Sequence, residues 1–300
     1  MMKITWQKMA IEEYAGFERS QGEKVVQVNE IYWKQLRPFF YRPLLPFREF
    51  PAGSVRPPIA GLLGGYQFAV LPQEKENSRL NMLIFQDPRS YTLDTLERHK
   101  RKQVISAAKE FTVRPLEDVS EFKEKAHPVY LSFYDRTNYG YKSERRDKKA
   151  FARWAELLYQ FPNNLILGAF RNSDLHAVSV SKLVEDTVIY SMMFCTNEAL
   201  RFYVPGFLLH LLREGAAKCP DAKQMFVGMY KYRGRTGVDD YYFVRGCQLV
   251  SKPAALRLNP LAMLYLRNRM PNEYLKLRGK LETEIESLAA AAKPHSGRNA

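Results

Sequence analysis

The chain has 300 residues, enough for about two domains, and its 46% hydrophobic and 26% charged residues are typical of a soluble globular protein. No stretch approaches the roughly 18 consecutive apolar residues of a membrane-spanning helix, so we expect no such helix. The formal net charge of +14 predicts attraction to a polyanion: nucleic acid, an anionic lipid surface or a phosphate-rich cofactor. A basic surface that only maintains solubility is the alternative.

The cysteines and the N-terminus bear on the cellular compartment. Cys195, Cys219 and Cys247 are too few and too scattered for a disulfide framework or a zinc ribbon, so we expect reduced thiols and no metal site. The first residues lack the apolar segment of a signal peptide. These features predict a protein of the cytoplasm.

The first third of the chain contains several predicted elements. Residues 66–71 and 80–85 have the composition of strands, and the polar loop between them predicts a hairpin or small sheet. A basic helix is expected over 96–109, followed by a short strand at 111–114. We place the first domain boundary near Pro115.

The middle of the chain begins with helices and then changes its hydrophobic period. Residues 118–161 are predicted to be helical, with breaks at Pro128 and at the loop 137–140. Three strand-like runs then follow at 165–170, 175–184 and 187–195. Because short polar turns separate these runs, we expect an antiparallel meander.

The elements expected after the meander are a helix over 205–218, a strand over 224–230, strands at 241–244 and 247–250, and a C-terminal helix over about 272–292. Between the strand at 224–230 and the strand pair lies a basic loop that contains glycine. We expect the tail after residue 293 to be disordered, because it is polar.

The order of elements from 118 to 250 resembles the GNAT fold of acyltransferases. In that fold, the helix after the third meander strand binds the donor's pyrophosphate at an exposed first turn, where backbone N–H groups are unpaired. The family's loop pattern is Gln or Arg, two residues, Gly, one residue, then Gly or Ala. Arg201 and Gly206 match this pattern, whereas Val204 replaces the first glycine. An ordinary helix start is the alternative for this segment.

The whole chain to about residue 280 resembles the Fem-type tandem GNAT proteins and their acetyltransferase-like relatives. Three segments carry this resemblance: the basic helix and strand at 98–113, the hairpin at 168–179 and the aromatic-glycine motif at 242–246. The resemblance implies an α/β (α+β) fold in which a mixed, mostly antiparallel sheet is flanked by helices. It also implies a degenerate GNAT-like domain over 1–115, an acyltransferase domain over 116–260, and a C-terminal helix and tail over 261–300.

Acyl transfer in this fold is direct attack of an amine on a thioester or ester, and it needs a base, an oxyanion donor and an acid. The resemblance implies that backbone N–H groups around Phe194 and Cys195 bind the oxyanion as part of the donor site. Tyr230 and Tyr232 are the candidates for the acid, although each tyrosine could instead be a packing residue. The sequence does not identify the base.

The loop at 133–141 lies over the acceptor site if the resemblance holds. Arg136 and Tyr139 are therefore candidates for contact with the acceptor, and a purely structural loop is the alternative. Glu185 and Asp240 are the carboxylates considered as a base. The basic cluster at 98–102 could meet tRNA phosphates or form a solvated helix face.

Three hypotheses for the function follow. The first is an N-acyltransferase that moves an acyl group, expected from acyl-CoA, to an amine of a small-molecule or cell-envelope precursor. The second is a tRNA-dependent aminoacyltransferase of Fem type, with aminoacyl-tRNA as donor. The third is a catalytically degenerate GNAT-fold protein that only binds an anionic partner. The sequence does not indicate the oligomeric state.

Overall fold

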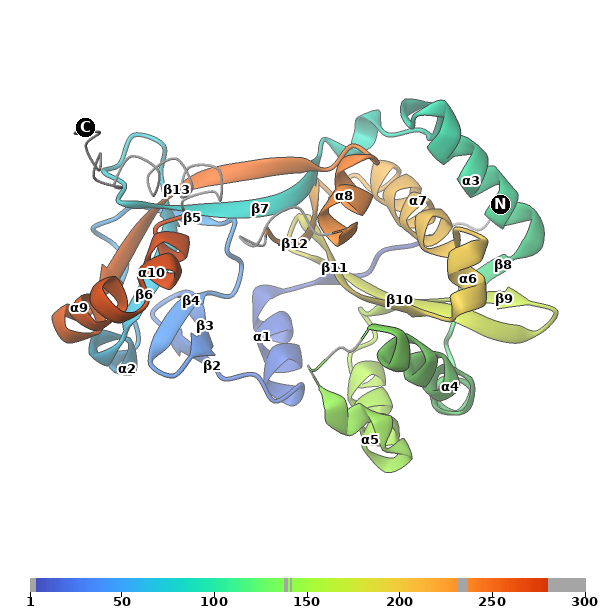
Figure 1. Cartoon of the computed structure of the whole chain (residues 1–300), viewed down its shortest axis with the longest axis horizontal. Helices are drawn as coiled ribbons and strands as arrows, with labels where there is room; N and C mark the ends of the chain where they lie inside the picture. Colours follow the sequence, from blue (N-terminus) through green and yellow to red (C-terminus); the bar gives the residue numbers. More distant parts are fainter. Residues whose placement is uncertain (1–3, 138–139, 141, 231–236, 280–300) are drawn as a thin grey trace, which may run out of the picture. The chain divides into compact units, whose positions relative to one another are not determined.

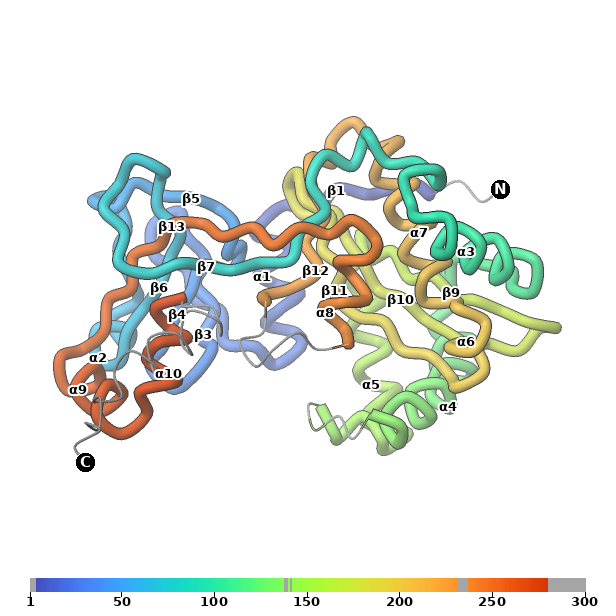
Figure 2. The backbone as a smooth tube through the Cα atoms, turned by 45° about the horizontal axis from the view of Figure 1, so that its top comes forward, coloured from blue at the N-terminus to red at the C-terminus, as the bar shows by residue number. Residues whose placement is uncertain are grey.

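The computed structural model describes residues 4–137, 140, 142–230 and 237–279. Contacts divide the chain into two units, each assembled from separate stretches of sequence (Figure 2). The first unit comprises Met1–Gly22, Ile84–Gly228 and Tyr242–Gln248, and the second comprises Glu23–Leu83, Met229–Tyr241 and Leu249–Ala300. This division differs from the domain boundaries expected near 115 and 260.

The first unit is built on the antiparallel meander that the sequence predicts. Its strands are β9 (Leu165–Arg171), β10 (Asp174–Val184) and β11 (Thr187–Cys195). At one edge, β8 (Thr112–Pro115) pairs antiparallel with β9, and at the other, β12 (Gln224–Met229) pairs parallel with β11. A short β1 (Lys8–Met9) pairs parallel with the end of β10. Because β8 pairs with β9, residues Thr112–Pro115 belong with the meander.

A tight turn explains why the first meander strands form a hairpin. Asn172 and Ser173 connect β9 to β10, and their φ angles are 50° and 76°. Two consecutive positive φ angles are typical of a type I′ turn, whose twist matches that of the flanking strands. Asparagine tolerates this conformation better than most residues. The register of the hairpin is therefore fixed locally.

Helices cover both faces of this sheet (Figure 1). One face carries α1 (Ile11–Ser20), α4 (Val119–Thr137) and α5 (Lys148–Tyr159). The other face carries α3 (Arg98–Glu110), α6 (Asn197–Arg201) and α7 (Val204–Ala217). Two short 3-10 helices, Pro88–Ser90 and Leu93–Thr95, precede α3.

The break predicted at Pro128 is wrong, because α4 continues through that residue. Pro128 is exposed, while Phe122, Ala126 and Tyr130 bury the opposite side of the helix. Burial of this apolar face outweighs the loss of one backbone hydrogen bond at the proline.

The second unit has its own core and a consecutive run of paired strands. In sheet order its strands are β2 (Val25–Val28), β3 (Ile31–Arg37), β4 (Phe40–Pro43), β6 (Gly65–Val70), β13 (Gln248–Leu258) and β7 (Ser78–Gln86), with β5 (Glu49–Phe50) also paired to β6. Its core is formed by Trp33, Tyr41, Phe68, Val70 and Ala255. Short helices complete it: α2 (Ile59–Leu63), α9 (Pro260–Arg269) and α10 (Pro271–Leu277).

Of the two alternatives predicted for 66–71 and 80–85, the hairpin is wrong, whereas both strands do lie in one sheet. In the sheet, β13 lies between β6 and β7. Side chains before and within β7 bind this intervening strand: Asn77 Oδ1 accepts from the Leu256 backbone N–H, and Ser78 Oγ donates to the Ala254 carbonyl. A C-terminal strand thus occupies the place that the hairpin model assigns to a local partner.

The strand predicted at 241–244 is also wrong, because residues up to Phe243 belong to α8 (Gly237–Phe243). The aromatic run in this segment favours a strand, but Asp239 and Asp240 lie in the first turn of α8, where carboxylates stabilise a helix. The strand expected at 247–250 is the start of β13. Of the expected C-terminal helix, α10 provides the beginning, and positions 280–292 lie outside the described residues.

Two general properties concern the part of the chain that the structure describes. No helix there is long and apolar enough to cross a bilayer. No group of three or more histidine, cysteine or acidic side chains gathers there as a metal site.

Candidate active site on the central meander

The strands β11 and β12 separate after a short paired segment. Their pairing joins Thr187–Ile189 to Gln224–Phe226, whereas β11 runs on to Cys195 and β12 to Met229. The part of β11 after Ile189 therefore lies beyond the segment that is paired with β12. A ligand with a carbonyl group can bind such a strand edge through main-chain hydrogen bonds.

A β-bulge lies at the point where the two strands separate. Val180 pairs with Met192, but the next residue of β10, Ser181, pairs with Tyr190, so Ser191 has no partner on β10. A bulge disrupts the ladder locally and redirects the backbone and side chain of the extra residue. Ser191 is exposed, unlike Tyr190 before it. The meander thus presents an accessible hydroxyl at the bulge, where β11 and β12 separate.

A buried lysine reaches this bulge from the neighbouring strand. Lys182 is 0% exposed, and its Nζ donates to Ser191 Oγ over 2.9 Å. The same ammonium lies 3.9 Å from the ring centroid of Phe17 and 5.6 Å from that of Tyr14, both on α1. A buried ammonium needs such partners, because losing its hydration is costly.

Sequence reasoning missed Lys182, although a signal was available. The lysine interrupts an otherwise apolar or small-residue run, Ala177-Val178-Ser179-Val180-Ser181-Lys182-Leu183-Val184, in the central strand of the meander. A strand buried on both faces rarely contains a lysine, so its presence there indicates a specific partner or function.

Phe194 and Cys195, expected to bind the donor, are both buried at the end of β11. The ring of Phe194 packs edge-on against Tyr130 on α4, with 5.4 Å between centroids. Burial raises the pKa of the Cys195 thiol, and the charge of Arg136 offsets this only in part. The thiol is therefore protonated at neutral pH and is not suited to act as a nucleophile.

Arg136 binds the end of β11 from the last turn of α4. Its Nη1 donates to the Cys195 carbonyl and to Asn197 Oδ1, both at 3.0 Å. These bonds fasten α4 to the strand end and to α6, which is a structural role. Contact of Arg136 with an acceptor stays a prediction, and Tyr139 lies outside the described residues.

The first turn of α7 is buried, whereas the sequence analysis expects it to be exposed. Val204 is fully buried and Gly206 is also buried. The guanidinium of Arg245 lies so close that a Cβ at Gly206 would be 3.2 Å from its Nη2. Arg201, by contrast, is exposed at the end of α6. The two matched residues of the loop pattern therefore differ in their access to a donor.

A buried cluster fixes the middle of α7. Tyr91 Oη and His210 Nδ1 are 2.9 Å apart, and the Arg213 guanidinium stacks over the Tyr91 ring at 3.6 Å. Burial raises the pKa of Tyr91 to about 12, lowers that of Arg213 to about 10, and lowers that of His210. The cluster therefore favours a neutral imidazole.

We expect this cluster to weaken as the pH falls. Since the folded state lowers the pKa of His210, the unfolded chain binds a proton below about pH 6.5 that the folded chain does not. The free energy of unfolding should thus fall between about pH 7.5 and 5.5, and it should fall less in His210→Gln. Urea unfolding of both proteins at the two pH values measures this difference. If the free energy of unfolding fell equally in both proteins, His210 would not contribute to the pH dependence.

The remaining predicted residues belong to the second unit, lie outside the described residues or serve other roles. Tyr230 belongs to the second unit by its contacts, and its backbone N–H donates to the Asn81 carbonyl. Tyr232 lies outside the described residues. The Glu185 carboxylate accepts from the Ile11 backbone N–H at the start of α1, so it acts as a helix cap rather than a base.

A histidine–carboxylate pair at the end of the meander does not supply the base either. His176 Nδ1 lies 3.6 Å from Glu198 Oε2 and 3.2 Å from Thr196 Oγ1. Along β10, His176 is four residues from Val180, which corresponds to roughly 13 Å. Direct proton transfer to a group at the bulge needs a much shorter distance.

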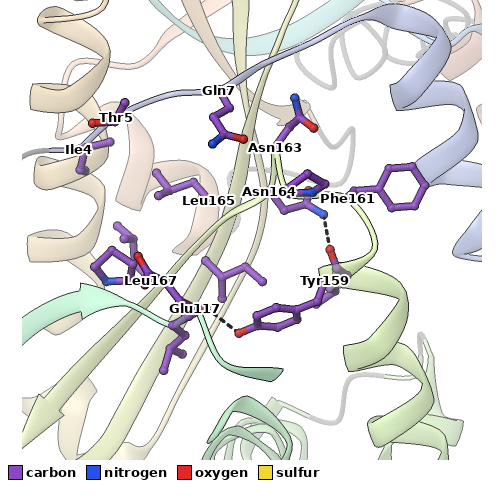
Figure 3. A pocket seen from close by; sticks show the side chains of 15 residues that line it. Ile4, Thr5, Gln7, Glu117, Tyr159, Phe161, Asn163, Asn164, Leu165 and Leu167 are labelled. Atoms are coloured by element: carbon purple, nitrogen blue, oxygen red, sulfur yellow. Dashed lines mark hydrogen bonds between the residues drawn. The ribbon is translucent and has the colours of Figure 1, made fainter. Parts of the chain in front are cut away.

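A cavity of about 500 Å³ lies beside the start of β9, between the N-terminal segment and the end of α5 (Figure 3). Tyr159 Oη donates to the Leu116 carbonyl across its wall, and Asn164 Nδ2 donates to the Leu158 carbonyl. Its lining contains one charged side chain, Glu117, and no lysine or arginine. A cavity without cations is poorly suited to a phosphate-rich donor. The cavity lies beside β9, which is two strand spacings, roughly 10 Å, from β11, the strand that contains the bulge.

Comparisons with known proteins define the fold. No family model and no curated protein sequence matches the chain. Its structure is similar to that of FemX, with a TM-score of 0.57 and 12% identity over 85% of this chain and 92% of that chain.

Two further solved structures are similar over most of their length. One is the C-terminal domain of a protein named as a lysylphosphatidylglycerol synthetase from Agrobacterium fabrum, with a TM-score of 0.53, 10% identity, and coverage of 84% of this chain and 89% of that chain. The other is L-PGS from Bacillus licheniformis, with a TM-score of 0.52, 12% identity, and coverage of 89% and 92%. The predicted fold class is confirmed: a mixed, mostly antiparallel sheet flanked by helices.

Proposed function

We propose that this chain is an acyl-group transferase that takes an aminoacyl group from aminoacyl-tRNA and transfers it to an amine. The observation that carries the proposal is the bulge of β11, where the buried Lys182 ammonium binds the exposed Ser191 hydroxyl beside the separating strands. The likeness to FemX and L-PGS over at least 85% of this chain supports the aminoacyl donor, as does the net charge of +14.

The chemistry at this edge is direct transfer. The acceptor amine attacks the ester carbonyl carbon, the bond from that carbon to the donor's ribose oxygen breaks, and the ribose oxygen gains a proton while the amine loses one. Negative charge develops on the carbonyl oxygen in the transition state. The Ser191 hydroxyl, held by Lys182, can donate to this oxygen and stabilise the charge.

A second candidate donor is acyl-CoA, and the position of Arg201 supports it. This cation is exposed immediately before α7, where the GNAT pattern binds the pyrophosphate. The buried Val204 and the Arg245 guanidinium against Gly206 argue for the tRNA donor, because they occupy the turn whose backbone N–H groups would contact coenzyme A.

Donor binding tests the proposal. Aminoacyl-tRNA should bind with an affinity that falls steeply with salt concentration, and Arg201→Ala should reduce the slope of log K against log salt by about 1 if Arg201 contacts a phosphate. Arg153→Ala, which removes an exposed arginine of α5, is the matched control and should leave the slope unchanged. Filter binding at several salt concentrations measures both.

Acyl-CoA as the donor would give a different binding result. If acyl-CoA were the donor, coenzyme A at roughly 100 times its dissociation constant would stabilise the protein by about 2.7 kcal/mol, and charged tRNA would not compete with it. That outcome would replace the tRNA donor by acyl-CoA. Failure of both ligands to bind would support the degenerate binding protein instead.

A further inference from the structure

The second unit exposes an apolar patch on two short helices. The patch consists of Ile59, Leu62 and Leu63 on α2 and of Leu261, Leu264 and Tyr265 on α9. Ile59 is 86% exposed, Leu261 78% and Leu63 65%. No residue of α9 is buried, so this helix does not owe its apolar composition to the core. Large aliphatic side chains in contact with water are costly, and their clustering indicates an interaction surface.

Hydrogen bonds join the end of α2 to the start of α9, so the two apolar helices are neighbours. Asn259, which caps α9, donates from its backbone N–H to the Gly64 carbonyl at the end of α2, over 3.0 Å. Its Nδ2 also donates to the Leu62 carbonyl. Both views show α2 and α9 as neighbours (Figures 1 and 2).

The segments that contain the two helices are basic. Residues 51–73 and 257–272, which contain the two helices, have no aspartate or glutamate. They contain four arginines, all exposed: Arg56, Arg257, Arg267 and Arg269. None of the four forms an ion pair with another described residue.

We propose that α2 and α9 form a surface through which this protein binds peripherally to an anionic lipid bilayer. Aliphatic side chains insert among lipid chains, whereas arginines bind the anionic headgroups around them. Tyr265 suits the boundary, because its ring is apolar and its hydroxyl is polar. Nucleic acid is the weaker match, since phosphates and bases are bound by cations and aromatic rings rather than by leucine and isoleucine.

Vesicle binding tests both the apolar and the basic residues of this surface. The full-length protein should co-sediment with vesicles of equal parts phosphatidylglycerol and phosphatidylcholine and bind far less to phosphatidylcholine alone. Leu261→Gln with Leu264→Gln should lower the partition coefficient about tenfold, and Arg267→Gln with Arg269→Gln should lower it at least tenfold. Glutamine is a good helix former, so α9 should persist in each variant.

Matched controls come from α3 in the first unit. Ile105 is 44% exposed, and Ile105→Gln removes one aliphatic side chain outside the patch. Arg98→Gln with Lys102→Gln removes two exposed cations there, and thereby gives the same net charge as the variant with two arginines replaced. Each control should change vesicle binding less than about threefold, because long-range attraction is screened within about 10 Å.

A reporter locates the contact directly. In Tyr265→Trp, the new indole should be quenched by brominated phosphatidylcholine mixed with phosphatidylglycerol, whereas in Ile105→Trp it should not be. If the leucine variants bound vesicles like the parent, or if the α3 controls lost as much binding, the proposed surface would be wrong.

Two other results would also overturn the proposal. Self-association in sedimentation experiments without lipid, lost in the leucine variants, would assign the patch to a second copy of the chain. Binding of RNA that depends on Arg267 and Arg269 but not on Leu261 and Leu264, together with no vesicle binding, would assign it to nucleic acid. Donor binding by the first unit is measured separately, so failure here leaves the transferase proposal unaffected.

Discussion

Replacing Phe194 with alanine should lower the free energy of unfolding by about 3–5 kcal/mol. The ring is fully buried at the end of β11 and contacts Tyr130 on α4 and Trp154 on α5. Truncation removes buried apolar surface and leaves a cavity between the meander and both helices. Guanidinium unfolding monitored by circular dichroism measures the loss.

The matched control is Ile105→Ala, since that side chain is exposed on α3 and its truncation should change stability by less than about 0.5 kcal/mol. The Phe194→Ala variant also separates the packing role of the ring from the role of the backbone N–H. Alanine keeps the backbone N–H expected to face the donor, so donor affinity of the folded fraction should be unchanged. A loss below about 1 kcal/mol would mean that the ring is not part of the core.

The meander was predictable because its determinants are local. The strands from Leu165 to Cys195 are joined by turns of two residues, and positive φ angles at Asn172, Ser173 and Glu185 suit those turns. Such short turns set the register next to them and leave few alternatives to an antiparallel pairing. The basic helix α3 and the strand β8 follow from equally local patterns.

The arrangement of the second unit was not predictable from local patterns. Ala254 pairs with Ala69, although 185 positions separate them in the sequence. Nothing in residues 66–85 reveals that a distant strand will lie between the two strands expected there, because the pairing depends on packing and not on a turn. The division into two discontinuous units has the same origin.

The candidate site was only partly predictable for a related reason. A spacing pattern identifies Arg201 and Gly206, but it cannot reveal that Arg245, far along the chain, covers Gly206. Lys182 carries a signal in its apolar strand, whereas the bulge at Ser191 arises from strand pairing alone. The residues that the structure brings together at β11 are therefore those that sequence spacing does not connect.

Replacing Lys182 with methionine should separate function from stability. Methionine has a similar length and fills the space beside Phe17 and Tyr14, but it lacks the ammonium that binds Ser191. Replacing a buried charge with an apolar side chain is often neutral or stabilising. We therefore expect unfolding free energy to be unchanged or higher, while kcat for aminoacyl transfer falls roughly 10²–10³-fold, as when an oxyanion donor is lost.

Lys182 would act as a positioning residue through the Ser191 hydroxyl, and a double-mutant cycle tests that route. In Ser191→Ala, the further change Lys182→Met should cost much less activity than it does in the parent, because the shared interaction is already absent. Single-turnover transfer from aminoacyl-tRNA, with the exposed Lys148→Met as control, provides the rates. Additive effects of the two changes would contradict this role, and so would a change in KM with kcat preserved. Either result would mean that Lys182 supports the fold or the binding of substrate and does not align the hydroxyl at the bulge.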